Sequence, residues 1–248
     1  HGWLNALPDL SAPYKTQGKI VHRPWFSPSE YKQLYTATRE YAREALPHVR
    51  WAAEQVHDFV LFMANTGLRP DEAKNLQHRD VEIVYDPILE EKILEIEVRG
   101  KRGVGFCKST AGAVLPYERL LKRAKPDRYL SEQEKGQTIY PKPTDLLFPG
   151  NQIKLFNNLL NRNNLKLDRD GNARTAYSLR HTYICLRLME GADIYQIAKN
   201  CRTSVEMIEK YYAADIKNTL DAAAINVRRS KRAKVIHKSY LSGEDGKT

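Results

Sequence analysis

One turn of the chain, Thr66-Gly67-Leu68-Arg69-Pro70-Asp71-Glu72, decides how the elements around it are organised. Gly67 follows an apolar helical pattern and permits a sharp left-handed turn at the end of that helix. Pro70 then opens a short helix, so Arg69 stands where free backbone N–H groups favour an anion. A guanidinium group there can hold a phosphate through two parallel hydrogen bonds, braced by Glu72. Taken alone, the pattern also fits a surface arginine that follows a helix cap.

Helical patterns lie on both sides of this turn. Ser27 can cap a helix that we expect to run to about Ala45, with Glu30 at the capping-box position. A second helix is expected over residues 49–65. Later helices are expected over residues 117–125, 152–165, 178–190, 193–199 and 204–212.

Between these helices, residues 81–85 and 93–98 alternate apolar and polar side chains with period two, which predicts two strands. Gly100-Lys101-Arg102-Gly103 forms a turn, and residues 104–107 return as a third strand. The predicted fold class is therefore α+β, mostly helical with a small three-stranded antiparallel sheet.

The amino-acid composition narrows the class of partner that this protein can bind. Forty Lys and Arg residues against 30 Asp and Glu residues give a formal net charge of +10, which attracts polyanions such as nucleic acid. No stretch approaches the ~18–20 apolar residues that a membrane span needs. Cys107, Cys185 and Cys201 are widely spaced, and the histidines lack metal-type pairing, so we expect no metal site.

A second arginine motif, Tyr177-Ser178-Leu179-Arg180-His181-Thr182-Tyr183, enters an apolar helix. The pattern predicts Arg180 in the first helical turn. His181 fits either a catalytic group or, more simply, a buried packing residue.

Two further features could complete a phosphate site. Lys101 lies in the strand turn, where a lysine is ordinarily solvated, but beside a phosphate it could deliver a proton to a leaving oxygen. Tyr211 and Tyr212 follow an amphipathic stretch and would ordinarily be packing residues. A phenol beside two arginines could instead act as a nucleophile, because the cations favour phenolate.

The ordered set of these motifs resembles the tyrosine recombinases, also called phage integrases, over about residues 27–225. The resemblance implies the catalytic-domain fold of that family. It also implies that Arg69 and Arg180 clamp the scissile phosphate and that Lys101 protonates the departing 5′ oxygen, with Lys108 as the alternative lysine. Tyr212 would attack phosphorus and form a 3′-phosphotyrosyl bond, without metal, ATP or another cofactor.

Two positions depart from the family pattern. Tyr177 stands where the family often has a histidine, three residues before the second arginine. Asn200-Cys201-Arg202-Thr203 replaces the usual Gly-His, so Arg202 could supply a cationic donor instead. The expected histidine after the nucleophile is also missing; the nucleophile assignment favours Tyr212, and Tyr211 is the alternative.

By the same resemblance, residues 1–26 would be a linker from an N-terminal core-binding domain, residues 27–226 the catalytic domain, and residues 227–248 a basic tail. Double-stranded DNA is the expected partner, in a bacterial or phage-type cytoplasmic setting. A homo-oligomer, a tetramer on DNA, would form through exchange of the C-terminal segment at residues 220–227. The residues expected to contact DNA are Arg99, Arg102, Arg228, Arg229, Lys231 and Arg232.

The resulting hypothesis is a site-specific recombinase or integrase. One alternative is a type IB topoisomerase-like enzyme, which would relax DNA without paired sites. Another is a catalytically silent DNA-binding accessory protein, motivated by Tyr177 and by the missing downstream histidine. An RNA-binding module is disfavoured because no aromatic-rich sheet motif is present.

Overall fold

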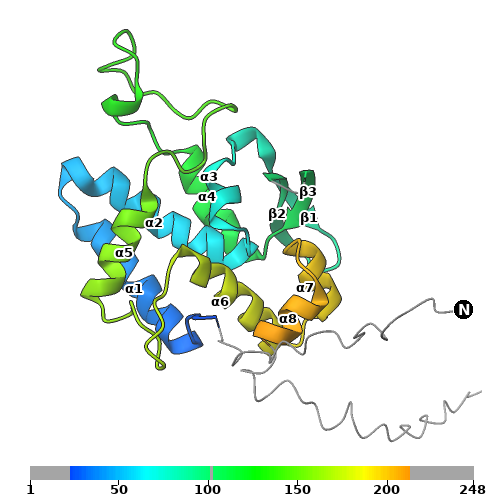
Figure 1. Cartoon of the computed structure of the whole chain (residues 1–248). Coiled ribbons are helices and arrows are strands. Elements are labelled where there is room, and N and C mark those ends of the chain that lie inside the picture. Colours follow the sequence, from blue (N-terminus) through cyan, green and yellow to red (C-terminus); the bar gives the residue numbers. More distant parts are fainter. Residues whose placement is uncertain (1–22, 101–102, 213–248) are drawn as a thin grey trace, which may run out of the picture.

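The computed structural model describes residues 23–100 and 103–212. Helices form most of this part, and one small sheet lies at their side (Figure 1). The central helix is α2 (Pro47–Thr66), against which α1 (Pro28–Glu44) packs along its length. Helix α2 also contacts α4 (Val114–Leu121), α5 (Gln152–Arg162) and α6 (Ala176–Met189).

The first two helices follow the sequence prediction closely. The Ser27 side chain accepts a hydrogen bond from the backbone of Glu30, and the Glu30 side chain accepts one from the Ser27 backbone, which completes a capping box. Helix α2 ends at Gly67, which has φ 66° and donates its backbone N–H to the Met63 carbonyl. The short helix α3 (Pro70–Lys74) follows at once, as predicted.

The sheet is antiparallel with strand order β1 (Val81–Asp86), β2 (Glu91–Gly100) and β3 (Gly103–Lys108). In the central strand, Ile96 lies opposite both Val81 and Cys107, and all three side chains are buried. The period-two alternation therefore places one face of the sheet against the helices, which confirms the predicted hairpin.

The remaining helices are shifted from their predicted bounds in three places. Helix α4 begins and ends earlier than expected, because a 3-10 turn leads into it and Lys122 caps its end. Helix α5 stops at Arg162 rather than 165, because Asn164 adopts a left-handed φ of 55°. Helix α6 starts two residues early, capped by Thr175, so Arg180 lies in its second turn and not, as predicted, in its first.

Two short helices complete the described fold, α7 (Ile194–Asn200) and α8 (Val205–Tyr211). They lie together next to the sheet (Figure 1) and pack on α6 around a second, smaller core. The 3-10 turns η1 (His78–Asp80), η2 (Ala111–Ala113) and η3 (Asp127–Tyr129) connect other elements.

Residues just before α1 already belong to the packed body. Phe26 is fully buried, and its backbone N–H donates to the Thr182 hydroxyl in α6 at 2.9 Å. The Trp25 carbonyl accepts a hydrogen bond from Arg174. Within the described ranges, no helix is long and apolar enough to cross a membrane, and no cluster of His, Cys, Asp and Glu is arranged to hold a metal ion.

Candidate active site

The turn after α2 brings three helices into close contact. A Cβ atom added to Gly67 would lie 2.4 Å from Cδ1 of Tyr183 in α6 and 2.9 Å from Sγ of Cys201 after α7. Only glycine therefore fits this position, both for its left-handed backbone and for the space available. At this turn the end of α2 meets the middle of α6 and the end of α7.

Arg69 is the residue just before α3, and hydrogen bonds from its backbone and side chain hold it in place. Its Nη1 donates to Glu72 Oε1 at 2.9 Å, and its backbone N–H donates to Glu72 Oε2 at 2.8 Å. Its Nη2 reaches the carbonyl of Arg202 at 2.8 Å. These contacts fix the guanidinium group. Among the described residues they leave further N–H groups free for an anion.

Arg180 is buried, with 4% of its surface exposed. Its Nη1 donates to the carbonyl of Gly67 at 2.6 Å, and its Nη2 donates to the carbonyl of Cys201 at 2.5 Å. Burial lowers the pKa of Arg180, but the guanidinium group remains charged at neutral pH. Arg69 and Arg180, more than a hundred positions apart in sequence, are thus tied to the same two turns.

Arg202 lies in the turn between α7 and α8 with a left-handed φ of 50°. Its guanidinium group faces Glu72, to which Nη2 donates at 2.5 Å. Burial alone would raise the pKa of Glu72, but the hydrogen bonds from Arg202 and from the Arg69 backbone hold it below its usual value. Arg202 therefore supports the carboxylate that braces Arg69, and it does not line the pocket described below.

Tyr212 is the last described residue, and its ring is buried with 6% of its surface exposed. Its hydroxyl group forms a hydrogen bond with Nδ1 of His181 at 2.6 Å. Burial raises the pKa of Tyr212 to about 12, although the charges of Arg23 and Arg180 lower it. The charges of Arg23 and Arg180 do favour phenolate, but desolvation of the buried ring outweighs them, so the pKa of Tyr212 lies above its ordinary value.

The other two candidate tyrosines, Tyr177 and Tyr211, have different neighbours. The Tyr177 ring stands 5.8 Å from the His181 ring. Tyr211 is half-buried beneath the guanidinium group of Arg23, whose Cζ lies 4.5 Å from the ring centroid. Arg23 was not among the residues singled out from the sequence, and a lone arginine in a Pro-rich stretch carries no periodic signal that could have identified it.

One pocket of about 360 Å³ joins these groups. It is lined by Arg23, by Arg69, which precedes α3, and by residues of α6, of the α7–α8 turn and of α8. Its walls are Arg23, Arg69, Tyr177, Arg180, His181, Ile184, Thr203, Ser204, Met207, Tyr211 and Tyr212. This set includes several residues predicted from the sequence. They are the two arginines Arg69 and Arg180, the three candidate tyrosines, and His181.

Of the two predicted lysines, only Lys108 is described. Lys101, with Arg102, lies outside the described residues. Lys108 points its amino group to Glu95 at 2.8 Å and does not line the pocket. Strand β3 nevertheless approaches the α7–α8 turn, because a Cβ atom added to Gly105 in β3 would meet Cδ of Arg202 at 2.9 Å.

Of the predicted DNA contacts, only Arg99 is described. It lies half-exposed at the end of β2, where it pairs with Glu97 at 3.0 Å and Asp80 at 3.4 Å. The others, Arg102, Arg228, Arg229, Lys231 and Arg232, lie outside the described residues, as does the proposed exchange segment at residues 220–227.

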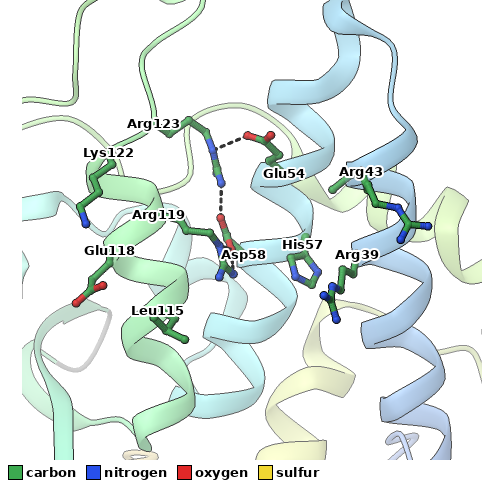
Figure 2. A pocket seen from close by; sticks show the side chains of 11 residues that line it. Arg39, Arg43, Glu54, His57, Asp58, Leu115, Glu118, Arg119, Lys122 and Arg123 are labelled. Atoms are coloured by element: carbon green, nitrogen blue, oxygen red, sulfur yellow. Dashed lines mark hydrogen bonds and ion pairs between the residues drawn. The ribbon is translucent and has the colours of Figure 1, made fainter.

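A larger pocket, of about 540 Å³, lies between α1, α2 and α4 (Figure 2). It carries several cations, but Asp58, which is fully buried, pairs with both Arg119 and Arg123. Arg123 also pairs with Glu54 at 3.1 Å. Arg119 and Arg123 are thus engaged with carboxylates, whereas in the smaller pocket three arginines lie together with His181 and three tyrosines. The smaller arginine pocket is therefore the better candidate for an anionic substrate.

Neither protein-family models nor curated protein sequences match the chain. Solved structures do match in fold. The XerH site-specific recombinase, in a post-cleavage complex with palindromic difH substrate, gives a TM-score of 0.56 at 21% identity, over 84% of this chain and 54% of that one. The catalytic domain of bacteriophage HP1 integrase gives 0.51 at 15% identity, over 86% and 100%.

A third match, Tn1549 transposon integrase in complex with circular intermediate DNA, gives a TM-score of 0.50 at 15% identity, over 83% of this chain and 65% of that one. The chain thus spans about half the length of the XerH chain and the whole of the HP1 catalytic domain. At these identities the likeness establishes the fold alone. It confirms the predicted fold class.

Proposed function

Since this chain has the catalytic-domain fold of tyrosine recombinases, we propose that it is a site-specific recombinase or integrase that cuts and rejoins DNA through a 3′-phosphotyrosyl intermediate. The observation that carries the proposal is the convergence of Arg69, Arg180 and Tyr212 on one pocket. Two fixed guanidinium groups beside a buried phenol suit an in-line attack on a phosphodiester.

Each residue has a role in this proposal. Arg69 and Arg180 bind the non-bridging oxygens of the scissile phosphate and stabilise the charge that develops in the transition state. Their contacts with Glu72 and with the carbonyls of Gly67 and Cys201 support this role, because the guanidinium groups are oriented before DNA binds.

Tyr212 attacks phosphorus, and the 5′ oxygen leaves with a proton that we assign to Lys101. The phosphotyrosyl bond retains the energy of the phosphodiester, so rejoining requires no ATP. Tyr212 is preferred to Tyr211 as the nucleophile, since Tyr212 Oη is buried and hydrogen-bonded to His181, whereas the half-buried Tyr211 ring lies under Arg23.

DNA is the proposed substrate and partner. The net charge of +10 supports it, as do the arginines of the pocket. The XerH and Tn1549 structures hold DNA, which fits the same proposal. Assembly into a tetramer through residues 220–227 remains part of the proposal.

The test is a nicked suicide substrate, from which the 5′ fragment diffuses away and leaves the protein attached to DNA. We expect a covalent adduct whose modified peptide contains Tyr212, identified by mass spectrometry. Tyr212→Phe should abolish the adduct and Tyr211→Phe should retain it. Sequence-specific DNA binding without any adduct would support instead the silent accessory protein, for which Tyr177 in the usual histidine position is the argument.

A further inference from the structure

The hydrogen bond between Tyr212 and His181 joins two buried groups. Nδ1 of His181 lies 2.6 Å from Oη of Tyr212, and the ring centroids are 5.4 Å apart. Only 4% of His181 and 6% of Tyr212 is exposed. Bulk water therefore has little access to the phenol proton, and the imidazole is already in contact with the oxygen proposed to attack.

The phenol needs a base. Burial raises the pKa of Tyr212 to about 12, more than Arg23 and Arg180 lower it, so the hydroxyl group is protonated at neutral pH. As the oxygen bonds to phosphorus, its proton must go to another group.

The pocket offers few acceptors for that proton. Its three arginines have no acceptor atom. The hydroxyl groups of Tyr177, Tyr211, Thr203 and Ser204 are weak bases. Among the described residues, no carboxylate lines the pocket. Glu72, which braces the site, is engaged by Arg69 and Arg202. Of the described residues that line the pocket, only His181 offers a ring nitrogen as an acceptor.

We propose that His181 is the catalytic base of strand cleavage, accepting the proton of Tyr212 at Nδ1 while the phenol oxygen bonds to phosphorus and the bond to the 5′ oxygen breaks. This inference rests on the proposed function. The leaving 5′ oxygen takes its proton from the general acid, assigned to Lys101. In rejoining, the 5′ hydroxyl attacks phosphorus and returns its proton to Lys101, and His181 returns the other proton to the departing Tyr212 oxygen.

The electrostatics of the pocket suit this step. Burial, together with the charges of Arg23 and Arg180, lowers the pKa of His181 to about 3, so the free site holds a neutral imidazole. A phosphodiester bound between the arginines offsets their charge, which makes His181 a stronger base once DNA is in place. Transfer within the pair leaves the net charge of the pocket unchanged, whereas release of the proton to water would leave an extra negative charge beside the phosphate.

The test compares single-turnover cleavage of two suicide substrates by the 248-residue chain, one with oxygen and one with sulfur at the 5′ leaving position. Sulfur leaves without protonation and so bypasses the general acid. We expect His181→Gln to cut both substrates about 10²–10⁴-fold more slowly than wild type. Lys101→Ala should be slow on oxygen and restored on sulfur. DNA affinity and Tm of His181→Gln should stay close to wild type.

A second measurement separates a base from a packing residue. Fluorinated tyrosine at position 212 is more acidic and depends less on a base, so it should accelerate His181→Gln more than it accelerates wild type. If the glutamine lowers Tm, His181→Asn provides the smaller amide for the same comparison.

Wild-type rates for the folded His181 variants, or restoration of their cleavage by sulfur, would overturn this inference alone. Failure of the wild-type chain to form any adduct would instead overturn the proposed function, and this inference with it.

Discussion

Arg202 and Glu72 form an ion pair across 130 positions of sequence, with Arg202 Nη2 at 2.5 Å from Glu72 Oε2. The same carboxylate accepts hydrogen bonds from the side chain and from the backbone N–H of Arg69. One acidic side chain therefore connects the turn after α2 with the turn between α7 and α8. The geometry of the arginine pocket depends on this link.

Replacing that carboxylate should weaken both the fold and the site. Glu72→Gln keeps the shape but removes the charge, so we expect a loss of about 1.5–3 kcal/mol in the free energy of unfolding, the range for hydrogen bonds to charged groups. Urea denaturation measures this loss. The control is Glu82→Gln at an exposed position of β1, which we expect to change the free energy of unfolding little. An equal effect of both substitutions would contradict a special role for Glu72.

The pH dependence follows from the same residue. The pKa of Glu72 is held below its ordinary 4.5, so its contribution to stability is fully present above about that pH and is lost as pH falls through the lower folded value. The free energy of unfolding, measured from pH 6 down to pH 3, should fall less steeply for Glu72→Gln than for wild type. Parallel curves for the two proteins would show that the pKa of Glu72 is not lowered on folding.

Substitutions at Gly67 and Gly171 separate the stability cost of backbone strain from that of steric crowding. Gly171 also has a positive φ, of 82°, but has no atom within 4 Å of an added Cβ. We expect Gly171→Ala to cost about 1–2 kcal/mol of stability from the left-handed backbone. Gly67→Ala should cost about 1–3 kcal/mol more, because its Cβ meets Tyr183 and Cys201. Similar denaturation midpoints for the two variants would count against the close approach of α2, α6 and α7.

Arg23 should contribute to DNA affinity. It is one of three arginines around the pocket, so Arg23→Ala should weaken binding and reduce the slope of log affinity against log salt by about 0.9, the value for one phosphate contact. Fluorescence anisotropy over a salt series measures that slope. Arg128→Ala is the matched control, since Arg128 lies against Trp51 and Tyr129 and does not line this pocket. Equal changes in slope would indicate a general charge effect.

The buried carboxylate in Figure 2 should matter for stability and not for chemistry. Asp58→Asn leaves Arg119 and Arg123 without their shared partner, which should cost about 3–5 kcal/mol of stability. The yield of covalent adduct per folded molecule should remain that of wild type. A selective loss of adduct in a protein that melts normally would place this second pocket in the reaction.

Much of the molecule could be predicted from local pattern. Capping at Ser27, the turn at Gly67 and the alternation in β1 and β2 depend on neighbours within a few positions, so the elements and their order follow from the sequence. Both clamp arginines were identified for the same reason, since each belongs to a short motif. Errors arose at helix ends, where one residue such as Asn164 or Thr175 decides the boundary.

The sequence by itself thus determined the fold class, the set of elements and a list of candidate groups, because propensity, capping and periodicity act over short distances. Only the tertiary structure decided how those groups meet. In the structure, Arg202 faces Glu72 and Lys108 forms an ion pair with Glu95. Arg23 lines the pocket, and His181 is hydrogen-bonded to Tyr212. The reason is physical: these contacts join helix ends and turns from distant parts of the chain, and where such ends meet is set by packing around the core, which no local pattern encodes.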